Sequence, residues 1–205
     1  MGLSLARLAE FACESEDAGI AGIFIPEGKN DGLLSCYARQ GDETFNGRTW
    51  ITNIFLREPA LCGWAVQAIE EETPGRFILG LGVSHRPLLE NLGITVQNLR
   101  ERLRDYTHEL RRVLKGASRT AGPAVPIYFA ALALETVRLG AELADGLMLD
   151  ICTIDRLRTA AAAARSTLDR SGRSGAQFTI TAGVPLFLHP DRNRAVAAAQ
   201  RTLAQ

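Results

Sequence analysis

An α/β fold built around a parallel sheet is predicted by three features of this sequence. Short apolar runs of strand length alternate along the chain with longer stretches that carry apolar residues at helical spacing. The strand-like runs are hydrophobic on both faces, which is typical of parallel strands that are covered by helices. The 205 residues, 46% hydrophobic and 22% charged, have an ordinary globular composition and suffice for a single domain over 1–205.

The predicted elements follow one another in a regular order. The first helix carries its apolar residues from Leu3 to Ala12 and ends near Gly19. Further helices are predicted at 31–40, 59–73, 96–114, 134–144, 155–170 and 191–204. Six strands are predicted between them, at 20–26, 49–56, 76–83, 125–131, 146–151 and 178–188. We expect a loop, and no tightly starting helix, after the strand at 76–83.

Two architectures share this pattern, an open doubly wound sheet and a (β/α) barrel. A full barrel needs eight strand–helix units and typically about 250 residues. This chain opens on a helix with no strand before it and closes on a helix. If it is a barrel, the first and last strands are therefore missing.

Charge and cysteine content narrow the classes of function. The 23 Lys and Arg balance the 23 Asp and Glu, which gives no electrostatic case for binding nucleic acid or an anionic membrane. Charged residues interrupt the first apolar stretch, and no apolar run is long enough to span a membrane, so we expect a cytoplasmic protein. Its four cysteines are too far apart for zinc binding and are expected to be reduced and buried: Cys13, Cys36, Cys62 and Cys152.

The segment that ends the strand at 76–83 is the first candidate for chemistry. Glycines at 80 and 82 would let a ligand approach the backbone closely. His85 stands where the dinucleotide-binding motif GxGxxG has its third glycine, which disfavours that motif. His85 is either a proton donor with a pKa near neutrality or a capping or surface histidine. His108 and His189 are expected to be structural or solvated, and no histidine spacing indicates a metal site.

Polar residues at two other strand ends are further candidates. Glu27 follows the strand at 20–26, where it would hold the polar edge of a ligand or be a solvated loop residue. Thr52 and Asn53 interrupt an apolar strand and need hydrogen-bond partners, which are a ligand or the neighbouring backbone. No Ser-His-Asp elbow, phosphate-binding P-loop or paired carboxylates are present, which disfavours hydrolases and P-loop enzymes.

The segment 74–85, Pro-Gly-Arg-Phe-Ile-Leu-Gly-Leu-Gly-Val-Ser-His, resembles the hallmark of the luciferase-like monooxygenase superfamily. It is most similar to the coenzyme F420-dependent oxidoreductase branch. Three further stretches agree in order and spacing: 23–27, 51–59, and 126–132 with 141–146. The resemblance implies a relative of the (β/α)8 barrel, with about six parallel strands present, that transfers a hydride between deazaflavin coenzyme F420 and a small organic substrate.

The resemblance also assigns roles to residues of this chain. It places Glu27 beside the cofactor ring, and Glu27 or His85 would be the catalytic group that orients substrate or moves a proton. The remaining positions would contact the ring or its tail: Thr52, Asn53, Ile54, Gly82, Val83, Ser84, Ala130 and Ala131. A non-proline cis peptide is expected at Asn53–Ile54. The basic residues Lys29, Arg57 and Arg86 would meet the anionic tail or be surface charges.

Two alternatives remain open at this point. One is an FMN-dependent monooxygenase of the same superfamily, because FMN and F420 share a tricyclic ring. The other is a non-catalytic, flavin-binding or self-associating barrel remnant. Many relatives have Asp-His or Glu-His where this chain has Glu27-Gly28, which removes one frequent acid. Unpaired strand edges would favour a homodimer.

Overall fold

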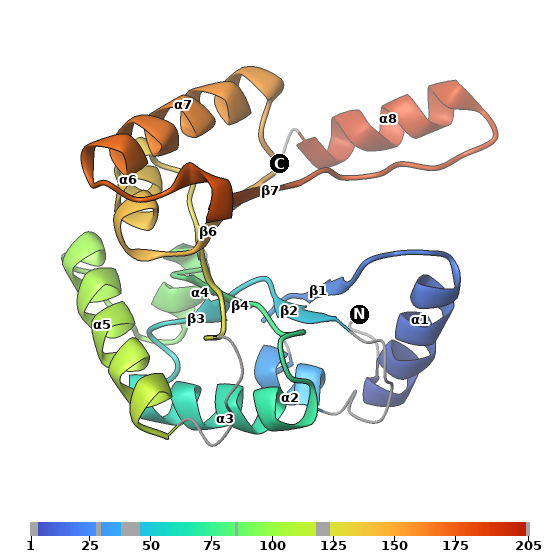
Figure 1. The fold of residues 1–205 in the computed structure, drawn as a ribbon. Coiled ribbons are helices and arrows are strands. Elements are labelled where there is room, and N and C mark those ends of the chain that lie inside the picture. Colours follow the sequence, from blue (N-terminus) through green and yellow to red (C-terminus); the bar gives the residue numbers. More distant parts are fainter. Residues whose placement is uncertain (1–3, 28–29, 38–45, 85, 118–123, 204–205) are drawn as a thin grey trace.

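A computed structural model describes residues 4–27, 30–37, 46–84, 86–117 and 124–203. Within these ranges there are seven strands, and a helix comes after each of them except β2 (Figure 1). The elements are α1 (Leu5–Asp17), β1 (Ile23–Ile25), α2 (Gly32–Tyr37), β2 (Gly47–Thr49), β3 (Thr52–Asn53), α3 (Pro59–Glu72), β4 (Leu79–Gly82), α4 (Arg86–Asn91), α5 (Leu99–Ala117), β5 (Ile127–Ala130), α6 (Leu134–Leu143), β6 (Gly146–Asp150), α7 (Ile154–Arg170), the 3-10 turn η1 (Gly175–Gln177), β7 (Thr179–Gly183) and α8 (Arg192–Leu203).

The order of the strands distinguishes the two predicted architectures. Every strand pair is parallel, and the pairs are β1–β2 and β3–β4–β5–β6–β7. The two groups are continuous, because β2 also bridges to the chain just before β4 through Arg48 and Ile78. Strand order therefore follows chain order without the reversal that defines a doubly wound sheet. The winding is that of a barrel, with β2 and β3 sharing one strand position.

The strand predicted at 49–56 is interrupted, which raises the number of strands from six to seven. Trp50 N–H still donates to the Ile25 carbonyl of β1 at 2.8 Å, whereas Thr52 is already in register with Leu81 of β4. The chain changes its pairing partner between these residues, and a cis peptide bond joins Trp50 to Ile51. The prediction of a cis peptide at Asn53–Ile54 is wrong, because the bond lies three residues earlier.

Other elements also differ from prediction. The strands are shorter than the apolar runs that predicted them, and after β7 residues 184–190 belong to no strand. The short helix α4 follows β4 where a loop was expected. Pro87 stands in its first turn, a position that suits proline because a helix leaves its first N–H groups unpaired.

The hydrophobic core lies between the sheet and the helices outside it. Leu79 and Leu81 of β4 are fully buried and belong to the main core cluster. Figure 1 shows α3, α5, α6 and α7 along this outer side of the curved sheet. Burial of a leucine, isoleucine or phenylalanine side chain contributes roughly 1.5–3 kcal/mol. This layer therefore holds β3 to β6 in place.

Polar groups tie the helical layer to the strands. Asp145 accepts hydrogen bonds from Arg111 of α5 and from the backbone N–H of Ile127, both at 2.9 Å. Gly63 of α3 lies so close to α5 that a Cβ there would be 2.6 Å from a methyl carbon of Val113. These contacts fix α3 and α5 against the sheet near β5.

All four cysteines are free, as the sequence predicts, but they differ in burial. Cys36 and Cys62 are buried, and burial raises their thiol pKa values to about 12 and about 11, so both stay protonated. Cys13 is exposed, so the prediction of burial is wrong there, because it lies on the outward face of α1. Within the described ranges, no three acidic, histidine or cysteine side chains are grouped as metal ligands.

None of the helices that the structure describes is both long and apolar enough to cross a bilayer.

Candidate functional site

The carboxyl ends of the parallel strands bring most of the predicted site residues to one rim. Asn53 of β3 is in register with Gly82 of β4, and Ala130 of β5 is in register with Met148 of β6. Because parallel strands share one direction, residues that end neighbouring strands meet at the same edge of the sheet. Residues 52–54, 82–84 and 130–131 therefore lie at one edge of the sheet.

Glu27 joins this rim through Asn53. The backbone N–H of Asn53 donates to Glu27 Oε2 at 2.7 Å, which links the end of β1 to β3. Burial raises the pKa of the Glu27 carboxyl above its usual value, and the hydrogen bond from Asn53 offsets only part of this rise. The arrangement is a carboxyl group that is held by backbone and keeps its proton to a higher pH than a solvated glutamate.

Two buried polar atoms beside Glu27 lack partners. Thr52 is fully buried and Asn53 is 1% exposed, yet Thr52 Oγ1 and Asn53 Nδ2 form no hydrogen bond within the structure. Asn53 Oδ1 is satisfied, since it accepts from Phe55 N–H at 2.9 Å. An unsatisfied buried polar group costs about 1–3 kcal/mol, so each of these atoms needs a partner that a bound ligand or water would supply. A ring with carbonyl and nitrogen atoms at its edge would offer acceptors for these donors.

The end of β4 packs closely against the chain before β3 and against the end of β5. A Cβ at Gly82 would be 2.9 Å from Ile51 Cγ1 and 3.0 Å from Ala130 Cβ, so only glycine fits there. Val83 is half-buried and packs on the core. Ser84 has φ of 61°, a left-handed conformation that is uncommon for serine and that turns the chain away from the sheet. His85 lies outside the described residues.

The other three residues predicted to contact the cofactor, Ile54, Ala130 and Ala131, differ in how far they are buried. Ile54 is fully buried in the core, and its N–H donates to the Gly82 carbonyl at 3.0 Å, so its part in the site is structural support. Ala131 is buried and its N–H donates to the Met148 carbonyl at 3.0 Å. Ala130 is half-buried beside Gly82. Ala130 therefore lies against the end of β4, and Ala131 joins the end of β5 to β6.

Trp50 is a further candidate for the site, and the sequence analysis did not single it out. Its ring meets the Phe24 ring edge-on, with centroids 5.1 Å apart and planes at 86°. It also reaches β7, because a Cβ at Gly183 would be 3.2 Å from Trp50 Cζ2. Trp50 thus spans the concave side of the sheet from β2 to β7. Gly183, inside the strand predicted at 178–188, was the signal in the sequence, because a side chain there would meet the Trp50 ring.

Of the three predicted basic residues, the structure describes the side chain of one. Arg57 is only 16% exposed and forms an ion pair with Asp31 Oδ2, so it is not a surface charge. Asp31 Oδ1 also accepts the N–H of Leu34 at 3.1 Å, in the first turn of α2. This pair connects the start of α2 with the loop before α3. Lys29 lies outside the described residues, and Arg86 is the first residue of α4.

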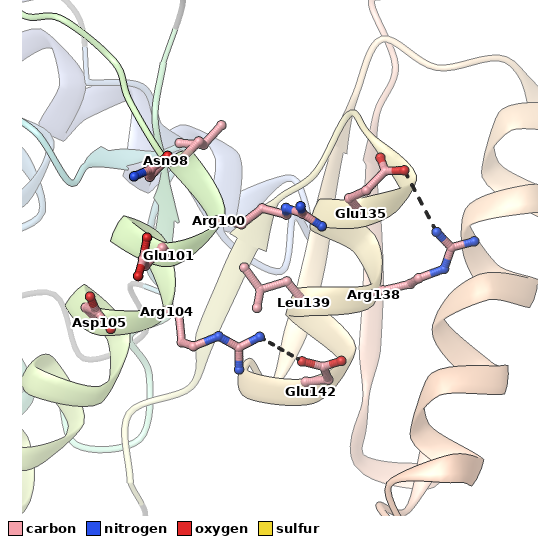
Figure 2. Close-up of a pocket in the computed structure, with 10 residues that line it drawn as sticks. Asn98, Arg100, Glu101, Arg104, Asp105, Glu135, Arg138, Leu139 and Glu142 are labelled. Atoms are coloured by element: carbon pink, nitrogen blue, oxygen red, sulfur yellow. Dashed lines mark hydrogen bonds and ion pairs between the residues drawn. The ribbon is translucent and has the colours of Figure 1, made fainter.

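A groove of about 700 Å³ lies between α5 and α6 (Figure 2). Its walls are mostly charged, and two ion pairs cross or flank it, Arg104–Glu142 at 3.2 Å and Arg138–Glu135 at 4.0 Å. None of the strand-end residues lines this groove. Because its lining belongs wholly to the outer helical layer, the groove is separate from the candidate site.

The winding order and the strand-end residues define a barrel-type α/β protein with its candidate site at the carboxyl ends of the strands. The family model of luciferase-like monooxygenases matches residues 2–205. The chain therefore belongs to the luciferase-like monooxygenase family, as the resemblance of its strand ends predicts.

The individual relatives share only a low sequence identity with this chain. The chain is 27% identical over 169 residues to the 5,10-methylenetetrahydromethanopterin reductase of Archaeoglobus fulgidus, covering 75% of this chain and 51% of that protein. It thus spans about half the length of this curated relative. The coenzyme F420-dependent tetrahydromethanopterin reductase of Methanopyrus kandleri superposes with a TM-score of 0.85 at 16% identity, covering 98% of this chain and 68% of that one.

A second similar structure is in complex with a different cofactor. The oxygenating constituent of 3,6-diketocamphane monooxygenase from Pseudomonas putida, in complex with FMN, superposes with a TM-score of 0.75. The identity is 15%, and the superposition covers 98% of this chain and 68% of that one. At these identities, the two solved structures show that the fold is shared.

Proposed function

We propose that this protein is an oxidoreductase that transfers a hydride between coenzyme F420 and a small organic molecule. The observation that carries the proposal is the pair of unsatisfied polar atoms, Thr52 Oγ1 and Asn53 Nδ2, buried at the strand ends beside Glu27. Two reductases that it resembles support this choice, one of them named as dependent on coenzyme F420. Coenzyme F420 would supply the hydride chemistry, as redox cofactors do.

The residues of this chain would bind and orient rather than carry electrons. The Thr52 hydroxyl and the Asn53 amide would donate hydrogen bonds to the edge of the ring. Gly82, Val83 and Ser84 would lie along one side, with Ala130 and Ala131 toward the tail. Trp50 would shield the ring from water on the concave side. Glu27, held by Asn53 N–H at 2.7 Å, would hold or release a proton at its carboxyl group.

FMN is the second candidate cofactor. The fold is shared with a monooxygenase that is in complex with FMN. The same two donors suit the edge of either tricyclic ring, so the polar atoms at Thr52 and Asn53 do not separate the two. On this reading the protein would be an FMN-dependent monooxygenase. A cytoplasmic location and a homodimeric state are further predictions from the sequence and belong to the same proposal.

Fluorescence titrations of the 205-residue protein with coenzyme F420 and with FMN test both candidates. We expect saturable binding of F420 and a loss of about tenfold or more in affinity for Thr52→Val and Asn53→Ala, since each removes a hydrogen bond. Thr52→Val should not destabilise the free protein, because the Thr52 hydroxyl has no partner there. Thr159→Val is the matched control, since Thr159 lies on the exposed side of α7.

The outcomes separate the candidates. Binding of F420 but not FMN supports the proposal, and binding of FMN alone moves the protein to the monooxygenase reading. If a folded protein binds neither, both enzyme proposals fail and the non-catalytic, self-associating alternative stands. Equal losses for Thr52→Val and Thr159→Val would show that ligand binds elsewhere.

A further inference from the structure

The two chain segments that hold the Glu27 carboxyl are joined by an ion pair. Arg57 lies in the turn between β3 and α3, and its guanidinium contacts Asp31 Oδ2. Asp31 Oδ1 accepts the N–H of Leu34 at 3.1 Å and so caps α2. Both carboxylate oxygens of Asp31 are therefore engaged, one by the helix and one by Arg57.

Asn53 connects this ion pair to Glu27. Its N–H donates to Glu27 Oε2 at 2.7 Å, and its Oδ1 accepts the N–H of Phe55 at 2.9 Å, within the turn that leads to Arg57. From Arg57 the ion pair returns to Asp31, which follows Glu27 closely in the chain. The contacts thus form a closed ring, so a change at either charged side chain would reach the Glu27 carboxyl.

The same two side chains also act on Glu27 through their charges. Burial is the largest cause of the raised pKa of the Glu27 carboxyl. Of the charged side chains that the structure describes, Asp31 raises this pKa further and Arg57 lowers it. Cys62 of α3 and Tyr106 of α5 stay uncharged, because burial raises the pKa of both groups. The charges around Glu27 are therefore one negative and one positive.

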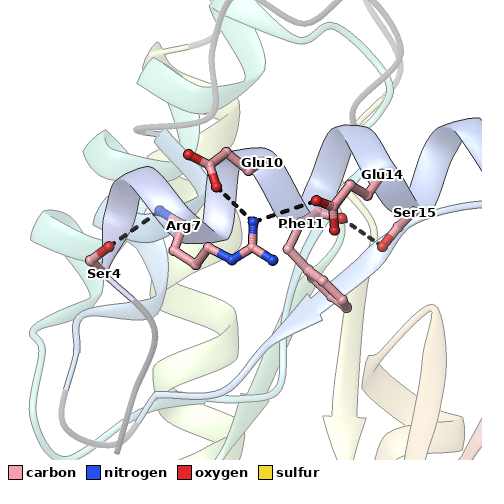
Figure 3. Close-up of polar contacts among 6 residues, drawn as sticks. All are labelled: Ser4, Arg7, Glu10, Phe11, Glu14 and Ser15. Carbon is pink, nitrogen blue, oxygen red and sulfur yellow. Dashed lines mark hydrogen bonds and ion pairs between the residues drawn. The ribbon is translucent and has the colours of Figure 1, made fainter.

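The ion pairs of α1 lie in a different setting. Figure 3 shows Arg7 between Glu10 and Glu14, with N–O distances of 2.6 and 3.4 Å. The Arg7 side chain is 52% exposed, and ion pairs at such positions contribute little because water and salt screen them. The Arg57 side chain is 16% exposed, so its charge is screened much less. The Arg57–Asp31 pair can therefore influence a neighbouring carboxyl more strongly than the pairs of α1 can.

We propose that Arg57 and Asp31 are positioning residues for Glu27, which hold its carboxyl in place and balance the charge around it. That Glu27 serves a reaction rests on the proposed function, whereas the coupling of the three side chains does not. With both partners present, their opposite charges offset each other at Glu27. Loss of either charge would leave the other unbalanced, so the two losses would act on the Glu27 proton in opposite directions.

An NMR titration of carboxyl-labelled glutamate tests the proposal in the ligand-free 205-residue protein. Glu27→Gln identifies the Glu27 signal, because that signal is absent from the variant. Asp31→Asn should lower the pKa of Glu27 by at least about half a pH unit, since Arg57 then acts alone. Arg57→Gln should raise it by a similar amount, since Asp31 then acts alone. Arg57→Lys keeps the positive charge, so its Glu27 should titrate close to that of the wild-type protein.

A purely structural role for the ion pair predicts a different pattern. If the pair only packed α2 against the end of β3, either loss would expose Glu27 to water, and its pKa would fall toward the usual value in both variants. Arg7→Gln is the matched control, because it removes an arginine from the exposed pairs of α1. This control should leave the Glu27 titration unchanged.

Circular dichroism checks that each variant is folded. If Arg57→Gln does not fold, Arg57→Met, which keeps the apolar stem of the side chain, replaces it with the same expectation. Opposite shifts for the two losses support the proposal. Shifts in the same direction overturn it, as does an unchanged Glu27 titration in both variants. Because the titration needs no cofactor, its outcome is independent of whether the protein binds F420 or FMN.

Discussion

The central strands and the two ends of the chain differ sharply in burial. All four residues of β4 are buried, whereas β7 has none that is buried and α8 has none among its described side chains. β4 has a strand on either side and helices outside it. Within the described chain β7 pairs with β6 alone, and it is followed by the exposed side chains of Val184, Leu186 and Leu188. The candidate site therefore lies on the buried centre of the sheet, where neighbouring strands and helices fix its residues.

Truncation of matched leucines should show the largest contrast between the two regions. Leu81 is fully buried and Leu186 is 78% exposed. We expect Leu81→Ala to lower the free energy of unfolding by about 2–5 kcal/mol, through lost burial and the cavity left behind. Leu186→Ala should change it by no more than about 0.5 kcal/mol. Urea denaturation measures both, and similar values for the two would remove the distinction.

Glycine substitution gives the next largest contrast. A Cβ at Gly80 would meet the Thr49 carbonyl oxygen and lie 2.8 Å from Met148 Sδ, whereas nothing lies within 4 Å of a Cβ at Gly175. Gly80→Ala should therefore destabilise the protein by about 1–3 kcal/mol, because the backbone must move. Gly175→Ala should leave stability unchanged or slightly raised. Thermal unfolding compares them, and a tolerated alanine at 80 would contradict the close packing of β2 on β4.

The buried hydroxyl group of Thr49 tests how the central strands are joined. Thr49 Oγ1 accepts the Gly80 N–H at 2.9 Å and donates to the Gly80 carbonyl at 3.1 Å, joining β2 to β4. Thr49→Val should cost about 1–3 kcal/mol, because it leaves a buried backbone N–H without a partner. Thr159→Val removes an exposed hydroxyl and should cost little. Equal stability of the two variants in urea would mean that Thr49 does not join the strands.

Substitution of Glu27 should have the smallest effect on stability, and this effect should depend on pH. Its pKa in the folded protein is raised above 4.5, mainly by burial, so the folded state favours the protonated form. The stability this contributes is complete below the unfolded pKa and is lost as pH rises through the folded pKa. The glutamine in Glu27→Gln cannot ionise. As pH rises, the unfolding free energy of this variant should therefore increase relative to that of the wild-type protein.

Glu109→Gln is the control for this prediction. Its pKa is lowered, mainly by a hydrogen bond from Arg112, so it should show the opposite trend. The stability that Glu109 contributes is present above its unfolded pKa and is lost as pH falls. Denaturation curves at a series of pH values measure both trends. If Glu27→Gln follows the wild-type protein at every pH, the carboxyl is solvated.

Much of the fold could be predicted from local pattern. The apolar run at 76–83 predicts β4, because a strand that is buried on both faces is apolar at every position. The stretch at 96–114 predicts α5, because a helix that is buried on one face has apolar residues at every third or fourth position. Periodicity could not predict the interruption of 49–56, since Trp50 and Thr52 are both compatible with a strand and differ only in the neighbour they pair with. Barrel winding likewise became certain only from the pairing order.

The site was predictable where burial and polarity conflict. Thr52 and Asn53 are polar residues in an apolar run, which signals a need for partners whatever the fold. The contacts that were missed join distant residues: Arg57 with Asp31, and Trp50 with Phe24 and Gly183. No local pattern encodes these, because each depends on how β1, β3 and β7 are brought together.

Amide hydrogen exchange with and without coenzyme F420 tests most directly whether ligand binds at the carboxyl ends of the central strands. We predict that F420 slows exchange in 50–54, 82–84 and 130–132 and leaves α7 unchanged. Slowed exchange in α5 and α6 alone, around the outer groove, or no change with a folded protein at saturating F420, would contradict it.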